Sequence, residues 1–135
     1  MILKINLMKL EIKSDPANLK IVRRNIESFC KEREIGVDVF NVKLAVDEAL
    51  QNIIRYAYNF EKTKDIIINF EKVSKSSLKV ELRDFGTKVS TSQIKPRELD
   101  DVRPGGLGIH FIKSIVKGMS YEHKEDGGTL LTLNF

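Results

Sequence analysis

The sequence DEALQNIIRYAY at residues 47–58 places a carboxylate and a carboxamide where one helix could present them together. Glu48 and Asn52 are four residues apart, so on a helix their side chains project from the same face. Mg²⁺ takes oxygen ligands and keeps several waters, so one amide oxygen plus the phosphates of a ligand can hold it. A carboxylate nearby can then orient a water or accept a proton from an attacking hydroxyl. The simpler alternative is a solvated helix margin without a chemical role.

A second candidate is Asp84, in the sequence Asp84–Phe85–Gly86 at the end of an apolar run. A carboxylate that leaves a strand at a glycine turn can project into a pocket and accept a hydrogen bond from a ligand amino group. Asp-x-Gly is also common turn chemistry, so an ordinary strand-ending turn is the alternative.

A glycine cluster, Gly105–Gly106–Leu107–Gly108, precedes another apolar-periodic segment. The unpaired N–H groups and positive dipole end of a helix that starts there can bind an anion, and glycines let phosphate oxygens approach the backbone. The cluster is not a Walker loop, because no Gly-Lys-Ser/Thr sequence follows, and it lacks the strand-glycine-helix unit of a Rossmann fingerprint. A glycine-rich loop that merely leads into a helix is the alternative.

The elements that must position these residues follow from the apolar periodicity. Alternation of apolar and polar residues predicts strands over residues 2–13, 65–73, 76–85, 119–126 and 128–135. A period of 3.6 residues predicts helices over residues 14–35, 38–58 and 106–119. Ser14 or Asp15 is the expected cap of the first helix. The apolar arc of the second helix is made of Val42, Val46, Ala49, Leu50, Ile53 and Ala57.

The predicted order is strand, helix, helix, strand, strand, loop, helix, strand, strand, which leaves room for few βαβ crossovers. It favours an α+β fold, a two-layer sandwich with about three helices on one face of a mixed, mostly antiparallel sheet. Residues 86–106 have no long periodicity and hold Pro96 and Pro104, so they indicate a long loop. A loop of that length inside one domain suggests a functional lid over residues 87–105.

The whole chain has the size and composition of one globular domain, covering residues 1–135. Its 23 basic and 19 acidic residues give a net charge of +4 without a dense Lys/Arg cluster, which argues against direct nucleic-acid binding. Cys30 is the only cysteine, so a cytoplasmic location without disulfides is expected. No stretch is long enough to span a membrane, and the N-terminal residues lack the pattern of a signal peptide.

The order of these features resembles the GHKL ATPase superfamily, which includes gyrase B, histidine kinases and MutL. EALQNIIRYAY is similar to its N box, RDFG to its first glycine box and GGLGIHFIK to its second. A Gly-Thr pair in the last hairpin completes the set, and the resemblance extends from about residue 5 to residue 135. The short chain, with a first strand and helix that run straight into the N box, is most similar to anti-sigma factor serine/threonine kinases of the RsbW and SpoIIAB type. The resemblance implies the Bergerat fold of that superfamily.

The resemblance also implies roles for the residues that match the motifs of the family. Asn52 corresponds to the Mg²⁺ ligand, and Glu48 to the general base or water-orienting carboxylate. Asp84 corresponds to the carboxylate that recognises adenine. Gly86 would let the base lie close, and Thr129 would help Asp84 to read it.

The phosphate-binding glycines of the family correspond to Gly106 and Gly108, with Leu107 between them in the same cofactor-binding segment. Arg103 precedes them, as a basic residue does in some relatives, and is expected to meet the terminal phosphate. ATP and Mg²⁺ are therefore the implied cofactors.

The function that the resemblance implies is an ATP-dependent protein serine/threonine kinase that acts as an anti-sigma factor. It would sequester a sigma factor and phosphorylate a STAS-domain anti-anti-sigma protein, and it could form a homodimer. No direct nucleic-acid or membrane partner is expected.

Two alternatives stay open at this point. A nucleotide-gated protein-binding regulator of the same fold with little kinase activity is suggested by two departures from the family pattern. These are Lys88, at a position that is often glycine, and Tyr56, where histidine is frequent. The catalytic domain of a histidine kinase is disfavoured, because residues 1–35 offer one strand and one helix in place of a two-helix dimerisation hairpin.

Overall fold

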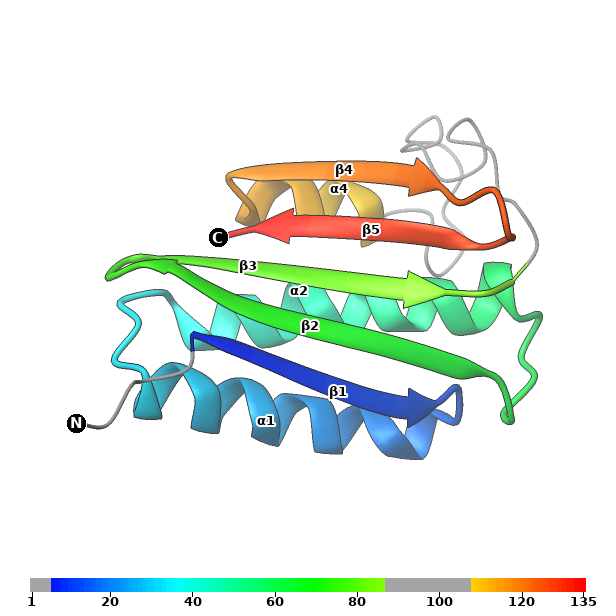
Figure 1. Cartoon of the computed structure of the whole chain (residues 1–135), viewed down its shortest axis with the longest axis horizontal. Coiled ribbons are helices and arrows are strands. Elements are labelled where there is room, and N and C mark those ends of the chain that lie inside the picture. Colours follow the sequence, from blue (N-terminus) through cyan, green and yellow to red (C-terminus); the bar gives the residue numbers. More distant parts are fainter. Residues whose placement is uncertain (1–5, 87–107) are drawn as a thin grey trace.

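Five strands of the described chain form one sheet in which every neighbouring pair is antiparallel. The computed structural model describes residues 6–86 and 108–135. Across the sheet the order is β1-β2-β3-β5-β4, so β3 is the central strand (Figure 1). The expected mostly antiparallel arrangement is confirmed. Among the described strands no neighbouring pair is parallel, so this part of the sheet is not mixed. The strands are β1 (Leu7–Lys13), β2 (Asp65–Ser74), β3 (Ser77–Asp84), β4 (Gly118–His123) and β5 (Thr129–Asn134).

The register at one end of the sheet brings together two residues that are far apart in the chain. Asp84, the last residue of β3, pairs with Thr129, the first residue of β5. On its other side Asp84 pairs with Ile66 of β2. The antiparallel ladder therefore sets the spacing between the Asp84 and Thr129 backbones.

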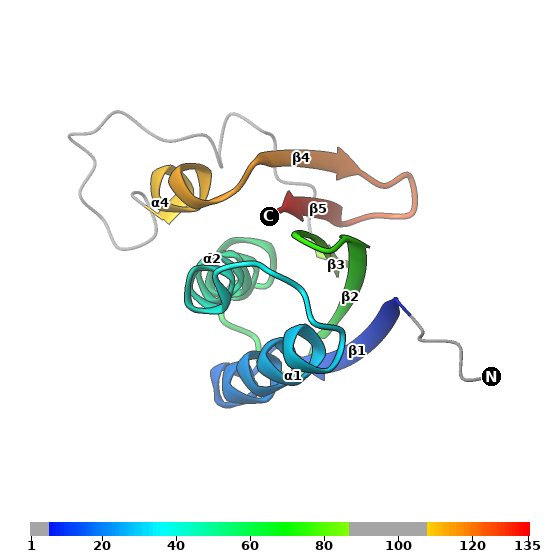
Figure 2. The ribbon, with the colours of Figure 1, turned by 90° about the vertical axis from the view of Figure 1, so that its left-hand side faces the viewer.

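Three α-helices of the described chain cover one face of this sheet (Figure 2). They are α1 (Leu19–Glu32), α2 (Val39–Asn52) and α4 (Gly108–Ile115), accompanied by a 3-10 helix at Pro16–Asn18 and a π-helical segment at Ile53–Ala57. The predicted two-layer α+β sandwich is confirmed. Within residues 6–86 and 108–135, no helix has the length and apolarity needed to cross a membrane.

The start of α1 shows which of two candidate caps is used. Asp15 Oδ1 accepts a hydrogen bond of 2.9 Å from the Ala17 N–H and so caps the 3-10 turn that leads into the helix. Ser14 is buried, and its hydroxyl donates to the Glu61 carbonyl at 2.5 Å, which ties the end of β1 to the segment before β2. The helix that follows buries one face, which includes Leu19, Val22, Ile26 and Phe29.

α2 begins as predicted at Asp38, whose Oδ1 accepts a hydrogen bond of 3.1 Å from the Asn41 N–H. The helix does not stay α-helical to Tyr58, because residues Ile53–Ala57 form the π-helical segment. Such wider turns are frequent at functional sites, and this one borders the pocket described below. The buried part of the apolar arc on α2 is Val42, Val46, Ala49 and Leu50.

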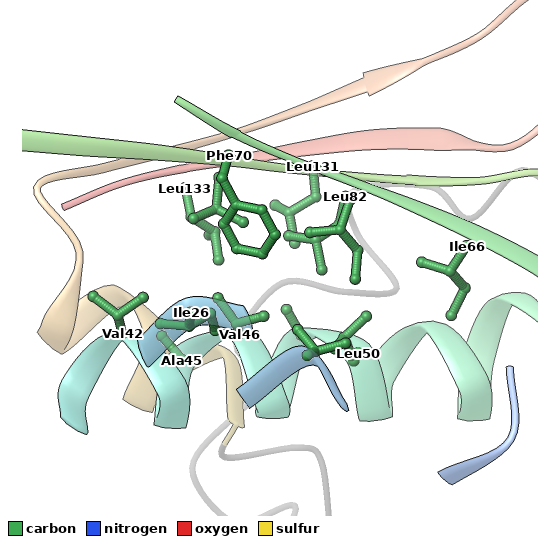
Figure 3. Packing of buried hydrophobic residues seen from close by; sticks show 14 of the residues in the cluster. Ile26, Val42, Ala45, Val46, Leu50, Ile66, Phe70, Leu82, Leu131 and Leu133 are labelled. Atoms are coloured by element: carbon green, nitrogen blue, oxygen red, sulfur yellow. The ribbon is translucent and has the colours of Figure 1, made fainter. Parts of the chain in front are cut away.

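The core lies between the helices and the sheet (Figure 3). Ile26 and Leu50 from the helices are fully buried, as are Phe70 and Leu82 from the strands. Truncation of one such side chain to alanine typically costs about 2–5 kcal/mol. Cys30 lies in the same core at 2% exposed, and burial raises the pKa of its thiol to about 11.

The third predicted helix is shorter than expected. α4 ends at Ile115 and β4 begins at Gly118, so the prediction of a helix up to Met119 was wrong over its last residues. The Lys117 N–H donates to the Asn134 carbonyl at 2.6 Å, and Gly118 then pairs with Asn134 in the sheet. Pairing with β5 therefore overrides the helical periodicity at this point.

Candidate functional site

A pocket opens where the end of β3 and the start of β5 meet the end of α2. Most of its lining side chains are apolar or aromatic, and Asn52, Asp84 and Thr129 supply the polar side chains. An apolar cavity with a few converging polar groups is the usual form of a small-molecule site. Three residues that the sequence singles out thus line one pocket. The complete lining is Ala49, Asn52, Ile53, Tyr56, Ala57, Asp84, Tyr121, Thr129 and Leu131.

Asp84 presents a buried carboxylate to this pocket. It is 5% exposed, and its Oδ1 accepts a hydrogen bond of 3.0 Å from the Gly86 N–H. Burial raises the pKa of Asp84, while hydrogen bonds from the backbone at Gly86 and Thr129 and the charge of Arg83 partly oppose the rise. A carboxyl group held in this way can accept a hydrogen bond from a ligand amino group, which would favour its charged form.

The turn after Asp84 contains Gly86 because a side chain does not fit there. A Cβ atom on Gly86 would clash with the Ala57 carbonyl oxygen and would lie 2.9 Å from the Ala57 carbonyl carbon. The turn therefore packs directly against the end of the π-helical segment. The family resemblance implies that Gly86 lets the base of a ligand lie close. Among the described residues, the group that lies close to Gly86 is instead the backbone of Ala57.

Tyr58 supports the site and was missed by the sequence analysis. It is 5% exposed, and its hydroxyl accepts a hydrogen bond of 2.7 Å from the Phe85 N–H and donates to the Asp65 carbonyl. The phenol thus bridges the start of β2 and the turn after β3. Burial raises the pKa of Tyr58, so the hydroxyl keeps the proton that it donates.

Thr129 reaches the pocket from a glycine turn. Gly128 has a φ of +81°, and a Cβ atom there would clash with the Asp84 carbonyl oxygen. Only glycine lets the turn between β4 and β5 approach the end of β3 so closely. Thr129 itself is 6% exposed, and its hydroxyl oxygen lies 3.4 Å from Nδ1 of His123. Backbone geometry therefore holds Asp84 and Thr129 together as a pair.

Glu48 and Asn52 converge on the first residue of α4. A Cβ atom on Gly108 would lie 2.7 Å from Glu48 Oε2 and 3.8 Å from Asn52 Nδ2. Both side chains therefore project from α2 toward the start of α4. This shared direction agrees with their spacing of four residues in the sequence.

The carboxamide of Asn52 has an atom that fits a metal ligand. Its Oδ1 is buried and has no hydrogen-bond partner among the described residues. A buried acceptor without a partner costs about 1–3 kcal/mol, and ligation of Mg²⁺ would satisfy it. Within the described residues, no group of three or more His, Cys, Asp or Glu side chains could hold a metal ion. An ion at Asn52 would therefore take further oxygens from a ligand such as a phosphate.

Comparison with known proteins identifies the family. The profile of the family described as "Histidine kinase-like ATPase domain" matches residues 12–135. The chain belongs to this ATPase family. The resemblance to GHKL ATPases that the sequence motifs indicate is thereby confirmed.

Curated relatives of this histidine kinase-like ATPase include the serine-protein kinase RsbW of Staphylococcus aureus. That protein is 29% identical over an alignment of 101 residues, and the match covers 69% of this chain and 63% of the relative. The match thus spans less than two thirds of the length of the relative.

Solved structures with this fold include the RsbU and RsbW domains of Rv1364c from Mycobacterium tuberculosis and the mycobacterial sensor histidine kinase MprB. The first has a TM-score of 0.65 at 16% identity and covers 96% of this chain and 32% of that chain. The second has a TM-score of 0.57 at 13% identity and covers 95% of each chain. At such identities the likeness shows the fold alone, and it agrees with the sandwich of histidine kinase-like ATPases.

Part of the expected nucleotide site of this histidine kinase-like ATPase lies outside the described residues. Gly108 is described, as the buried first residue of α4. Tyr56 lines the pocket and is 41% exposed. Outside the described residues lie Arg103, Gly106, Leu107, Lys88 and the expected lid at residues 87–105.

Proposed function

We propose that this chain is an ATP-dependent protein serine/threonine kinase that acts as an anti-sigma factor. The observation that carries the proposal is one pocket lined by Asn52, by the buried carboxyl group of Asp84 and by Thr129. The Oδ1 of Asn52 has no hydrogen-bond partner within residues 6–86 and 108–135. Membership of the histidine kinase-like ATPase family supports ATP as the ligand. The similarity to the serine-protein kinase RsbW supports a hydroxyl group of a protein as the phosphoryl acceptor.

Recognition of adenine is assigned to Asp84 and Thr129. The 6-amino group would donate a hydrogen bond to the Asp84 carboxylate, whose Oδ1 already accepts one from the Gly86 N–H. The Thr129 hydroxyl would meet the neighbouring ring nitrogen, and the apolar side chains of Ala49 and Ile53 would pack against the base. A 6-oxo purine would instead place an acceptor against the carboxylate, which is unfavourable.

Phosphoryl transfer is assigned to the region where α2 meets α4. Mg²⁺, held by Asn52 and by phosphate oxygens, would supply neutralisation of the charge on the triphosphate. Glu48, whose carboxylate borders Gly108, would accept the proton of the attacking hydroxyl of the partner. The oxygen of that hydroxyl would bond to the γ-phosphorus while the bond to the β–γ bridging oxygen breaks, and ADP would leave.

The glycine segment at the start of α4 completes the proposed site. Gly106, Leu107 and Gly108 would offer backbone N–H groups to the phosphates at the positive end of the α4 dipole. Arg103 would meet the terminal phosphate through charge-assisted hydrogen bonds. These assignments rest on the sequence motif, and of the four residues Gly108 is the one within the described residues.

The proposed partners are a sigma factor, which the kinase would sequester, and a STAS-domain anti-anti-sigma protein, which it would phosphorylate. A homodimer is compatible with this function, and no direct nucleic-acid or membrane partner is proposed. A cytoplasmic location belongs to the proposal, because a single cysteine fits a reducing compartment.

Incubation of the chain with γ-labelled radioactive ATP, Mg²⁺ and a panel of STAS-domain proteins from the same genome tests the proposal. The expected result is transfer of the label to one STAS protein, and loss of that transfer with Asn52→Ala or Asp84→Asn. ATP binding without transfer to any partner would favour the nucleotide-gated regulator. A chain that does not bind ATP would overturn the proposal.

A further inference from the structure

The side chain of Arg83 contacts two segments at the end of the sheet. Its Nη1 donates to the Asp84 carbonyl at 2.7 Å and to the Gly127 carbonyl at 2.9 Å. Its Nη2 pairs with Asp126 Oδ1 at 2.8 Å. The guanidinium carbon lies 4.4 Å from the centroid of the Phe85 ring. These contacts leave 13% of the Arg83 side chain exposed.

Arg83 lies behind the pocket and is not part of its lining. It precedes Asp84 in β3, and successive side chains of a strand point to opposite faces of the sheet. The Asp84 side chain faces the pocket, so the Arg83 side chain is on the opposite face, away from a bound ligand. The proposed kinase reaction therefore gives these contacts no direct role.

The two segments that Arg83 joins carry the two polar residues assigned to adenine. Asp84 ends β3, and the turn that includes Asp126 and Gly127 leads directly to Thr129 at the start of β5. The turn contains two glycines with positive φ, +103° at Gly127 and +81° at Gly128. Two backbone hydrogen bonds close this turn, from Gly127 N–H to the Lys124 carbonyl at 3.0 Å and from Lys124 N–H to the Gly128 carbonyl at 3.1 Å. Because glycine loses the most conformational freedom on folding, the contacts of Arg83 add to these bonds in keeping the turn in one position.

The chemistry of the contacts requires arginine. Two backbone carbonyls and a carboxylate are bound at once by the planar array of five N–H donors of a guanidinium, which also stacks on an aromatic ring. A lysine ammonium keeps the charge but is a single point on a flexible stem, so it cannot span the same partners.

We propose that Arg83 is a positioning residue for nucleotide selection, which holds the β4–β5 turn against the end of β3. Asp84 and Thr129 then keep the separation that selects a 6-amino purine over a 6-oxo purine. This inference rests on the proposed function, because it assumes that the pair reads adenine. A looser turn would move Thr129 relative to Asp84 and weaken contacts that only the 6-amino purine makes. The ratio of the affinities for the 6-amino and the 6-oxo purine should therefore fall, in addition to the affinity for each nucleotide.

Titration calorimetry of the full chain with Mg-ATP and Mg-ITP tests this role, because ITP carries a 6-oxo purine. Arg83→Lys keeps the charge and removes the planar donor array. Arg23→Lys is the matched control, since Arg23 pairs with Asp47 at 2.6 Å between α1 and α2 and does not line the pocket. Arg83→Lys should lower the preference for ATP over ITP roughly tenfold, the effect of one lost hydrogen bond. Arg23→Lys should leave the preference unchanged.

A second variant keeps the test decisive if Arg83→Lys does not fold. Asp126→Ala, at a turn position with 74% of its side chain exposed, removes one of the contacts and should lower the same preference. A purely structural role would weaken the binding of both nucleotides equally. An unchanged preference for ATP over ITP in folded variants would therefore overturn this inference but leave the proposed function standing. A parent chain that binds neither nucleotide would overturn the proposed function, and this inference with it.

Discussion

Glu48 and Asn52 leave the same face of α2 one turn apart, but their polar atoms meet different surroundings. Asn52 Oδ1 is buried and without a partner in the part of the chain that the structure describes. The Glu48 side chain is half-buried, and its carboxylate borders the Cα of Gly108. An unpartnered buried acceptor indicates a binding role, whereas a carboxylate at the start of α4 can take a proton during transfer. We therefore expect substitutions of the two residues to affect different steps, Mg-ATP binding for Asn52 and phosphoryl transfer for Glu48.

Asn52→Ala should reduce the Mg²⁺-dependent part of the ATP affinity, and phosphoryl transfer with it, because it removes the proposed ligand oxygen. Glu48→Ala should bind Mg-ATP like the parent but transfer phosphate about 10²–10⁴-fold more slowly, the usual contribution of a general base. Calorimetry with and without Mg²⁺ and a single-turnover assay measure the two effects separately. If both variants bind and turn over like the parent, the pair is only a helix margin and the kinase proposal is wrong.

Asp84→Asn should weaken nucleotide binding about 10- to 150-fold while leaving the fold intact, since loss of a hydrogen bond to a charged group costs about 1.5–3 kcal/mol. Its effect on stability depends on pH. Burial raises the pKa of Asp84, so between its unfolded and folded pKa values the native state binds more protons than the unfolded chain. The free energy of unfolding of the parent therefore falls as the pH rises through that window, which begins at about pH 4.

The carboxamide that Asp84→Asn introduces does not titrate, so the variant should gain stability relative to the parent as the pH rises from about 4 through the raised pKa of Asp84. Urea unfolding of both proteins at a series of pH values measures this difference. An equal pH dependence in parent and variant would contradict the burial of a carboxyl group at this position, and near-normal ATP affinity would contradict the adenine assignment.

At the scale of elements, the site depends on how the π-helical segment meets the turn after β3. Gly86→Ala should place a methyl group against the Ala57 backbone and force one of the two segments to move. We expect a loss of about 1–3 kcal/mol in the free energy of unfolding and weaker ATP binding. Gly118→Ala is the control, because among the described residues its Cβ would meet only Asn134 Nδ2 at 3.7 Å. Equal effects of the two substitutions in denaturant unfolding would refute this account of the turn.

The bridge made by Tyr58 joins the same elements from the helical side. Tyr58→Phe removes the hydroxyl and leaves the Phe85 N–H and the Asp65 carbonyl without that partner. The expected cost is about 1–3 kcal/mol of unfolding free energy, with faster exchange of the Phe85 amide hydrogen. Tyr56→Phe, at a residue that is 41% exposed, should change stability little. Hydrogen-exchange mass spectrometry and urea unfolding measure both effects, and similar results for the two variants would count against the bridge.

At the scale of the whole molecule, most of the fold could be predicted because its signals are local. The Asp15 and Asp38 caps, the alternating strands and the glycine turn at residues 127–128 are all visible in short stretches of sequence. The end of α4 could not be predicted, because Gly118 leaves the helical pattern to pair with Asn134, a residue distant in the chain. The π-helical segment was missed because an α turn and a π turn leave similar apolar patterns over five residues.

Some residues of the candidate site could likewise be predicted from short stretches of sequence, whereas others could not. Asn52, Asp84 and Thr129 line one pocket, and the sequence singles them out through motifs whose residue types bind ligands. Periodicity alone does not predict that Asp84 pairs with Thr129, because the pairing depends on strand order. The family resemblance implied only that the two residues act on the same base. Tyr58 and Arg83 were missed because several of their partners are backbone groups, which every residue has and no motif records.

Because Cys30 is buried, its reaction with a thiol reagent can report how often the chain unfolds around it. It is the only cysteine, it is 2% exposed, and its pKa of about 11 keeps it as the thiol, whereas thiol reagents attack the thiolate. Alkylation should therefore occur only in molecules that have unfolded around α1, at a rate that tracks their population. ATP that binds only the folded chain should slow alkylation by the factor 1 + [ATP]/Kd. Mass spectrometry of the adduct would then measure nucleotide affinity without any phosphoryl acceptor, and labelling as fast as that of a free thiol would contradict the burial.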